Sequence, residues 1–210
     1  MRAILITAGA TRNPIDAMRF ISAHSTGRTG AWLATSLSEV AHVTVLGSPL
    51  ALTFCAEPVV TLGFTTTQDL MEKMEAWVRA NPDGLVIHAA AVGDYAVTDL
   101  SPDQKIPSGQ EILTLQLVPT PKILDAIQGW SSNVSLVSFK AAAPGTTGSA
   151  LESIAAAQGM RTGSDRVFAN TIGQFDRDVL IWSPSGCTGY QKREDALEAL
   201  LSWARDLVTD

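Results

Sequence analysis

The sequence predicts an α/β fold, in which helices cover a Rossmann-like, doubly wound and mostly parallel sheet. Short apolar runs such as residues 2–7 (RAILIT) and 42–46 (HVTVL) alternate with stretches whose apolar residues recur at helical spacing, such as residues 68–80. Alternation of strands and helices at this spacing forms βαβ units, whose strands lie parallel in one sheet. The chain of 210 residues is expected to form a single domain, residues 1–210.

In the first half of the chain, turn signals bound each predicted element. Residues 2–7 end at Ala8-Gly9, and an apolar run before a glycine turn is typical of a strand that is buried on both faces. The helical stripe of residues 68–80 ends at the turn sequence Asn81-Pro82-Asp83-Gly84. The expected strands here are residues 2–7, 42–46, 59–62 and 85–91, and the expected helices are residues 29–40 and 68–80.

The middle of the chain departs from this alternation. Residues 97–118 are predicted to be a protruding flap and hairpin arm, because serine, proline and glycine are frequent in residues 98–110. A half-exposed strand is expected at residues 111–118, where leucine and polar residues alternate with period two. The regular alternation then resumes, with expected helices at 121–130, 149–158 and 193–208 and expected strands at 134–139, 166–169 and 178–182.

Composition excludes several classes of protein. The net charge is −6 and the pI is about 5.0, which argues against binding to nucleic acid or to an anionic membrane. No run reaches the ~18 apolar residues that a membrane span needs, and the first residues do not resemble a signal peptide. We therefore expect a cytoplasmic protein. Only 17% of the residues are charged, which suggests that some surface is buried against a second copy.

The turn after the first strand is a candidate phosphate site. Gly9 closes the strand, and Ser25-Thr26-Gly27 precedes the next expected helix. Glycine and small hydroxyl residues at a helix N-terminus expose backbone N–H groups that bind phosphate, and Arg19 and Arg28 are candidates to add charge. The alternative is an ordinary glycine turn with solvated arginines. The segment is neither a Walker loop nor a GxGxxG motif, which disfavours a nicotinamide-dependent reductase.

Two further segments carry candidate binding residues. Ala89, Ala90 and Ala91 at a strand end allow a flat ring to approach the backbone, and Asp94 is a candidate to accept from a base or ribose or to hold a cation. The alternative is close packing of a helix over small residues. Lys105 lies in the predicted flap and is a candidate phosphate clamp, although a lone lysine is usually solvated. His88 is expected to be a hydrogen-bonded core histidine.

The sequence shows no pattern typical of a metal site, a zinc–thiolate site or a catalytic triad. The three histidines, at positions 24, 42 and 88, lack metal-ligand spacing, and the two cysteines cannot form a four-thiolate zinc site. The adjacent His24 and Ser25 lack an acidic residue that would orient a catalytic triad. No protein-bound metal is therefore predicted.

Several segments, taken in order, resemble the phosphopantothenate–cysteine ligase family in its free-standing form. They are ITAGATRNPIDAMRFIS, HSTGRTG, HAAAVGDY, KIPSG, LTLQLVPTPKIL, VSFK and FAN, and they extend over nearly the whole chain. The resemblance implies a homodimer that joins 4′-phosphopantothenate to cysteine in coenzyme A biosynthesis, through an acyl-nucleotidylate. The implied cosubstrate is CTP or ATP with Mg²⁺ on the triphosphate, and no flavin is expected.

The resemblance also assigns site residues. It implies that Arg19 holds the substrate phosphate, that Lys105 clamps the nucleotide phosphates, and that Gly9 lies near phosphates. The other residues implied to bind the nucleotide are Ser25, Thr26, Gly27, Ala89, Ala90, Ala91, Asp94, Thr120, Pro121, Lys122, Ile123, Phe139, Lys140 and Arg161.

This chain departs from the family pattern at two places. Ala23 stands where the family has an asparagine that processes the acyl intermediate, and a methyl group makes no hydrogen bond. The helix after VSFK carries Arg161 near the second of two basic family positions but alanine or glutamine near the first, and Lys140 is a candidate to compensate. The alternatives are a divergent member that activates another carboxylic acid, or a nucleotide-binding module that has lost turnover because of Ala23.

Overall fold

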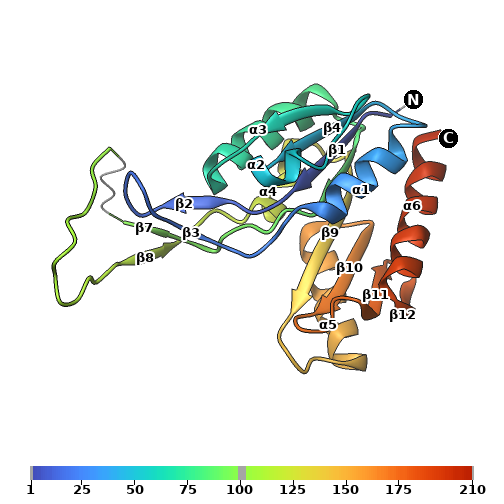
Figure 1. Cartoon of the computed structure of the whole chain (residues 1–210). Coiled ribbons are helices and arrows are strands. Elements are labelled where there is room, and N and C mark those ends of the chain that lie inside the picture. Colours follow the sequence, from blue (N-terminus) through green and yellow to red (C-terminus); the bar gives the residue numbers. More distant parts are fainter. Residues whose placement is uncertain (1, 99–102, 210) are drawn as a thin grey trace.

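A computed structural model describes residues 2–98 and 103–209 of the chain. Its main sheet has eight strands in the order β12-β11-β10-β9-β6-β1-β4-β5. The six strands from β10 to β5 are parallel, and β11 and β12 are antiparallel to their neighbours. This arrangement confirms the predicted doubly wound, mostly parallel sheet (Figure 1).

Most of the strands of the main sheet and most of its helices lie close to the predicted positions, but strand β12 and the short helix α2 were not predicted. The strands are β1 (Ile4–Ala8), β4 (Val43–Gly47), β5 (Val60–Gly63), β6 (Leu85–His88), β9 (Ser135–Ala142), β10 (Arg166–Thr171), β11 (Arg177–Ser183) and β12 (Gly186–Lys192). The helices are α1 (Arg28–Leu37), α2 (Pro49–Leu52), α3 (Thr67–Ala80), α4 (Ile123–Trp130), α5 (Gly148–Thr162) and α6 (Arg193–Thr209). No described helix is long and apolar enough to cross a bilayer.

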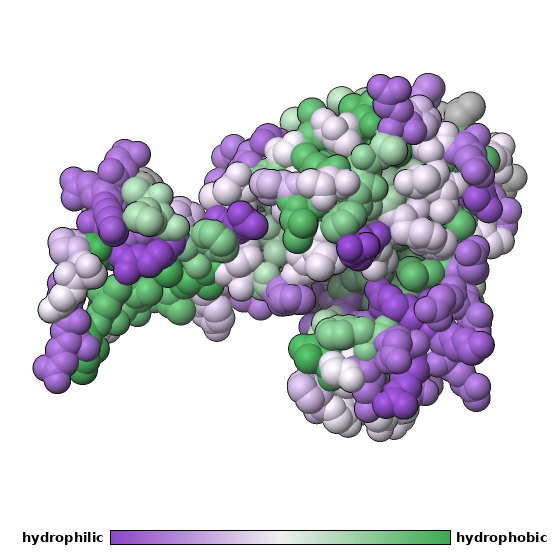
Figure 2. All heavy atoms as spheres, viewed as in Figure 1, coloured by the Kyte–Doolittle hydropathy of each residue, from purple (hydrophilic) through white to green (hydrophobic). Residues whose placement is uncertain are grey.

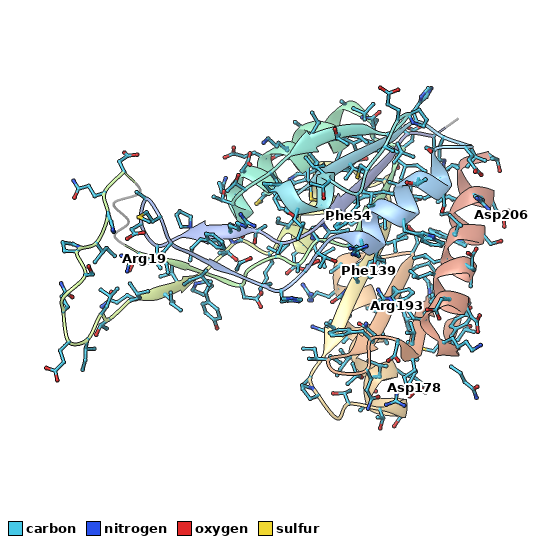
Figure 3. All side chains as sticks on the ribbon, viewed as in Figure 1. Arg19, Phe54, Phe139, Asp178, Arg193 and Asp206 are labelled. Carbon is cyan, nitrogen blue, oxygen red and sulfur yellow. The ribbon has the colours of Figure 1, made fainter. Side chains whose placement is uncertain are left out.

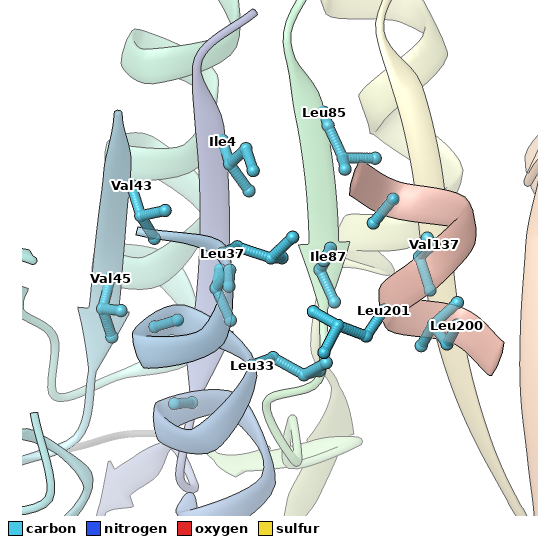
Figure 4. Packing of buried hydrophobic residues seen from close by; sticks show 14 of the residues in the cluster. Ile4, Leu33, Leu37, Val43, Val45, Leu85, Ile87, Val137, Leu200 and Leu201 are labelled. Atoms are coloured by element: carbon cyan, nitrogen blue, oxygen red, sulfur yellow. The ribbon is translucent and has the colours of Figure 1, made fainter. Parts of the chain in front are cut away.

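Apolar side chains bury both faces of the sheet. On one face, Leu33 of α1 and Leu201 of α6 pack with Ile4, Ile87 and other strand residues (Figure 4). On the opposite face, α3 and α4 contribute a second cluster, and α5 packs on β10 and β11 in a third. Alternate residues of each strand supply the two faces, as period-two strands require. The core therefore fixes the carboxyl ends of the strands, where loops leave the sheet.

A long arm projects from one end of the sheet (Figure 1). It contains two small antiparallel hairpins, β2 (Arg12–Pro14) with β3 (Phe20–Ser22) and β7 (Tyr95–Val97) with β8 (Leu117–Pro119). The predicted arm at 97–118 is present in its described part, and its residues 99–102 lie outside the described residues.

The predicted strand at 111–118 is wrong over most of its length, because only Leu117 and Val118 are in β8. Residues 111–116 lack a partner strand among the described residues, and alternation alone does not hold a strand without ladder hydrogen bonds. The arm exposes large apolar side chains, and Figure 2 shows hydrophobic residues gathered along its lower side. The exposed large apolar residues in the described part of the arm are Met18, Phe20, Tyr95, Ile112, Leu113, Leu117 and Val118.

The packing of α5 on the sheet depends on Gly159. A Cβ built there would lie 2.0 Å from Cζ3 of Trp182, whereas a Cβ at Gly129 of α4 would meet no atom within 4 Å. We expect Gly159→Ala to lower the free energy of unfolding by about 1–3 kcal/mol or more, because an overpacked core strains its neighbours. Gly129→Ala should leave stability unchanged or raise it by up to about 1 kcal/mol. Urea unfolding measures both, and equal effects would contradict this account.

Candidate functional site

A cleft of about 470 Å³ opens at the carboxyl ends of the parallel strands. It lies where the strand order reverses, since β4 flanks β1 on one side and β6 flanks it on the other. Ligands of open α/β sheets bind at this switch point. The segment before α1, the loop after β6, the start of α4 and the end of β9 all contribute to its lining.

Glycines bring the N-terminus of α1 against the end of β1. Gly9 and Gly27 have φ values of 88° and 82°, and a Cβ on Gly27 would lie 2.8 Å from the Gly9 nitrogen. A Cβ on Gly30 would lie 2.7 Å from Cβ of Ala8. Gly27 is the N-cap residue of α1 and makes no side-chain cap hydrogen bond, and the Thr26 hydroxyl accepts from the Arg28 nitrogen only at a long 3.5 Å. Its first backbone N–H groups are therefore available to an anion in the cleft.

The three alanines after β6 form part of the cleft wall beside this turn. The Ala91 nitrogen donates to the Gly9 carbonyl at 2.8 Å, and Ala91 also bridges to Ala10. Thr120 also lines the cleft, and its hydroxyl donates to the Gly93 carbonyl of the same loop at 2.6 Å. The predicted phosphate turn and the predicted ring-binding alanines thus face one common space.

The cleft is cationic although the protein is acidic. Five cationic side chains and two carboxylates line it, a net charge of +3 against −6 for the whole chain. They are Arg28, Lys122, Lys140, Arg161 and Arg193, with Asp94 and Asp125. Lys122 forms an ion pair with Asp94, and Arg161 forms one with Asp125. Three of the cations have no carboxylate partner among the described residues: Arg28, Lys140 and Arg193. Their positive charge is therefore available to attract an anionic ligand.

Arg193, at the start of α6, is a cleft residue that the sequence analysis missed. Its Nη2 donates to Oγ1 of Thr29 at 3.2 Å, and its guanidinium lies 5.0 Å from the ring centroid of Phe168. The Asn170 amide lies between this guanidinium and the Lys140 carbonyl, and the amide orientation that satisfies both groups has its oxygen accept from Nη1 of Arg193 at 3.0 Å. Arg193 is 164 residues from Thr29 in sequence, and no local motif indicates that contact.

His88 is a buried histidine, as predicted, and it also lines the cleft. It is 4% exposed, and its Nδ1 lies 2.9 Å from the Thr7 hydroxyl. Burial lowers the pKa of the His88 imidazole to about 4, because desolvation disfavours the charged form. The side chain is therefore neutral at physiological pH.

Most of the predicted nucleotide-binding residues lie together in this cleft. The lining includes Ser25, Thr26, Gly27, Ala89, Ala90, Ala91, Asp94, Thr120, Pro121, Lys122, Ile123, Phe139, Lys140 and Arg161. Gly9 lies directly behind Gly27. The lining also includes Gln158 and Phe175, which the sequence analysis did not single out as binding residues, and Gln158 stands near the first basic family position.

Arg19, Lys105 and Ala23 do not line the cleft of their own chain. Arg19 lies on the arm, well apart from Phe139 and Arg193 (Figure 3). Its guanidinium pairs with Asp16, which also accepts from the Ile106 nitrogen at 3.0 Å. The Arg19 side chain, together with backbone N–H groups, holds the pKa of Asp16 far below its usual range. Asp16 thereby connects Arg19 with the segment that carries Lys105, through the Ile106 nitrogen.

Comparisons with known proteins point to one family. A family model described as the DNA/pantothenate metabolism flavoprotein C-terminal domain matches residues 1–181. The coenzyme A biosynthesis bifunctional protein CoaBC of Thermococcus kodakarensis is 37% identical over 173 residues, which are 82% of this chain and 42% of that protein. The CoaBC protein of Escherichia coli K12 is 31% identical over 179 residues, 81% of this chain and 41% of that protein.

A solved structure agrees with this likeness. The DNA/pantothenate metabolism flavoprotein from Streptococcus pneumoniae superposes with a TM-score of 0.85 at 27% identity, covering 98% of this chain and 99% of that one. The chain spans about two fifths of the length of the curated relatives that it matches.

The lowered pKa of His88 predicts a component of stability that depends on pH. The imidazole takes up a proton below about pH 6.5 in the unfolded chain but only near pH 4 in the folded one. The contribution of His88 to the free energy of unfolding is therefore fully present above pH 6.5 and is lost as the pH falls toward 4. The expected loss is roughly 3 kcal/mol, and His88→Asn should lack it. Urea unfolding of both proteins between pH 4 and 7 measures the difference, and parallel pH profiles would contradict the assignment.

Proposed function

The chain belongs to the family described as the DNA/pantothenate metabolism flavoprotein C-terminal domain, and we propose that it is a nucleotide-dependent ligase that joins 4′-phosphopantothenate to cysteine. The observation that carries the proposal is the cationic cleft beneath the uncapped N-terminus of α1. The ordered motifs that resemble the phosphopantothenate–cysteine ligases surround this cleft, and two curated relatives are coenzyme A biosynthesis proteins.

In the first step, a carboxylate oxygen of phosphopantothenate attacks the α-phosphorus of CTP or ATP. The bond from the α-phosphorus to the bridging oxygen breaks, and pyrophosphate leaves with the negative charge. The N–H groups at the start of α1 and the guanidinium of Arg193 lie on one side of the cleft, suited to binding that charge. Lys140, on β9, adds a cation near Phe139.

In the second step, the amine of cysteine attacks the acyl carbon of the nucleotidylate. The bond between that carbon and the phosphate oxygen breaks, the amine loses a proton, and the nucleoside monophosphate leaves. The amide forms because the nucleoside monophosphate is a far better leaving group than the oxide ion that would have to leave from the free carboxylate. The cleft contributes by holding the acyl and amino groups close together.

We propose that a divalent cation is bound only by the triphosphate and not by protein side chains. No cluster of three or more histidine, cysteine or acidic side chains among the described residues is placed to hold a metal. The two carboxylates of the cleft already pair with Lys122 and Arg161. These residues do not fit a protein-held Mg²⁺, so the ion would be bound by phosphate oxygens, and no step above depends on a protein ligand to it.

The arm is proposed to complete the site of a second copy in a homodimer. Arg19 and Lys105 are joined through Asp16 on the arm, away from the cleft of their own chain. The described part of the arm exposes seven large apolar side chains, and apolar surface of this kind marks an interface. If the arms of two copies packed against each other, Arg19 and Lys105 of one chain would lie toward the cleft of the second chain.

The activity itself has a direct test. With phosphopantothenate, cysteine, Mg²⁺ and either CTP or ATP, the protein should release pyrophosphate, and Lys105→Ala should slow that release at least 10-fold, because a charged group on the transferring phosphates is lost. Lys73→Ala is the matched control, since Lys73 lies on α3 outside the cleft lining. Absence of release with both nucleotides would refute the ligase, and equal effects of the two substitutions would refute the clamp.

A mixing experiment tests the shared site. We expect Arg19→Ala and Lys140→Ala each to be nearly inactive, because one loses an arm cation and the other a cleft cation. Mixed in equal amounts and allowed to exchange subunits, they should regain up to about a quarter of wild-type activity, since about half of the dimers are mixed and each mixed dimer holds one intact site out of two. A mixture no more active than its components would place both residues in the same chain's site, and a monomeric mass in light scattering would exclude the dimer.

A further inference from the structure

The carboxylate of Asp16 is buried at the tip of the β2–β3 hairpin, and one of its two oxygens belongs to an ordinary turn. Asp16 is 4% exposed, and its Oδ1 accepts from the backbone nitrogens of Met18 and Arg19 at 2.9 and 2.8 Å. Aspartate side chains in turns commonly accept from N–H groups two or three residues further along the chain. The bonds of Oδ1 are therefore explained by the turn alone.

The other oxygen, Oδ2, binds groups that the turn does not require. It accepts from the Ile106 nitrogen at 3.0 Å, across 90 residues of sequence. It also accepts from the Arg19 guanidinium, through Nε at 3.1 Å and through Nη2. A carboxylate oxygen is only an acceptor, and charge-assisted bonds to it are strong and directional. Oδ2 therefore joins the guanidinium of one arm segment to the backbone of another.

The backbone on both sides of Lys105 is bonded to this same turn. Before Lys105, the Gln104 carbonyl accepts from the Ala17 nitrogen at 3.1 Å. After it, Ile106 donates its N–H to Oδ2 and accepts at its carbonyl from Nη2 of Arg19 at 3.1 Å. Three hydrogen bonds thus hold the segment that carries Lys105 to the turn that carries Arg19.

The hairpin that ends in this turn is attached to the body of the protein. Asn13 of β2 is 3% exposed and accepts at Oδ1 from the Thr67 nitrogen at the start of α3, at 3.0 Å. Its Nδ2 donates to the Tyr95 carbonyl of β7 at 3.0 Å, and the Arg12 nitrogen donates to the Thr65 carbonyl at 2.7 Å. The two arm cations are therefore connected through the hairpin to the helices that cover the sheet.

Arg19 keeps part of its guanidinium available after these contacts. Its Nε and Nη2 hold Asp16 and Ile106, whereas Nη1 has no partner among the described residues, and the side chain is 44% exposed. A guanidinium presents five N–H donors in a fixed fork, so one edge can bind an anion while the other edge keeps a carboxylate. Binding of a phosphate at Nη1 therefore leaves the bonds to Asp16 and Ile106 in place.

We propose that Asp16 is a positioning residue that holds Arg19 and Lys105 as one unit at a set separation. This inference rests on the proposed function, in which Arg19 holds the substrate phosphate and Lys105 the nucleotide phosphates. Two cations in a fixed relation present the two anionic ligands to each other, which favours attack of the substrate carboxylate on the α-phosphorus. Being buried, Asp16 acts through the two cations and not by contact with a substrate.

A double-mutant cycle tests whether Asp16 acts through Lys105. Asp16→Asn should lower kcat/KM for the nucleotide at least 10-fold, because an amide NH₂ at either oxygen position would face an N–H donor. Lys105→Ala should then cost less than about 3-fold in the Asp16→Asn protein, against at least 10-fold in the wild type, because the lysine is already misplaced. An equal cost of Lys105→Ala in both proteins would overturn the positioning role.

Asp69 of α3 provides the matched control. Its carboxylate also accepts from a backbone nitrogen, that of Thr65 at 2.9 Å, and pairs with a cation, Lys73, but it lies outside the arm and the cleft lining. Asp69→Asn should keep kcat/KM within about 2-fold of the wild type and should leave the full effect of Lys105→Ala. A loss equal to that of Asp16→Asn would show that removal of any such carboxylate is enough, and would overturn the assignment.

Hydrogen exchange tests the contact itself, without turnover. In the wild type, the Ile106 amide should exchange at least 10-fold more slowly than that of Gly109, after correction for intrinsic rates, because the Gly109 nitrogen has no partner among the described residues. The protection should be lost in Asp16→Asn. Equal rates in the wild type would overturn the proposal even if Asp16→Asn does not fold. An unprotected Ile106 in an active enzyme would overturn only the positioning role, whereas failure to release pyrophosphate would refute the ligase.

Discussion

The site depends on one steric constraint, the close approach of α1 to the end of β1. Gly27 and Gly30 permit it, because a Cβ on Gly27 would lie 2.8 Å from the Gly9 nitrogen and one on Gly30 would lie 2.7 Å from Cβ of Ala8. A Cβ on Gly9, the third glycine here, would instead meet Ser48, the N-cap residue of α2, at 2.0 Å. Two of the three also have positive φ, which glycine adopts without strain. The approach places the uncapped start of α1 beside the alanine loop after β6, and the Gly9 carbonyl holds that loop through Ala91.

The charge of the cleft is assembled from separate elements. Its cations come from α1, the N-cap of α4, β9, α5 and α6, and only the fold brings them together. The net charge of −6 excludes an extensive anion-binding surface but does not describe a local pocket. Lys140 and Arg193 both add positive charge to the cleft, and the Asn170 amide lies between the Lys140 carbonyl and the Arg193 guanidinium.

The sequence predicted the sheet well and the arm less well, for a physical reason. Buried parallel strands are continuous apolar runs, so β1, β4 and β6 are recognisable from composition. The arm strands are three residues long and exposed, and β12 (GCTGYQK) is mostly polar, so hydrophobic periodicity does not mark them. Cleft residues in ordered motifs were found, whereas Arg193 and Gln158 were missed because their roles arise from tertiary contacts.

Affinity and selectivity have different physical origins in this cleft. Cations and helix N–H groups attract any polyphosphate, and dissolved salt screens that attraction. They cannot distinguish one nucleotide from another, because every nucleoside triphosphate carries the same phosphates. His88 and Gln158 are of another kind, because burial and hydrogen bonding make them neutral groups of fixed orientation. Burial keeps the His88 imidazole uncharged, and the surrounding hydroxyls fix which atom donates and which accepts. The cleft therefore combines cations, which attract any anion, with neutral side chains whose donor and acceptor atoms are fixed by their neighbours.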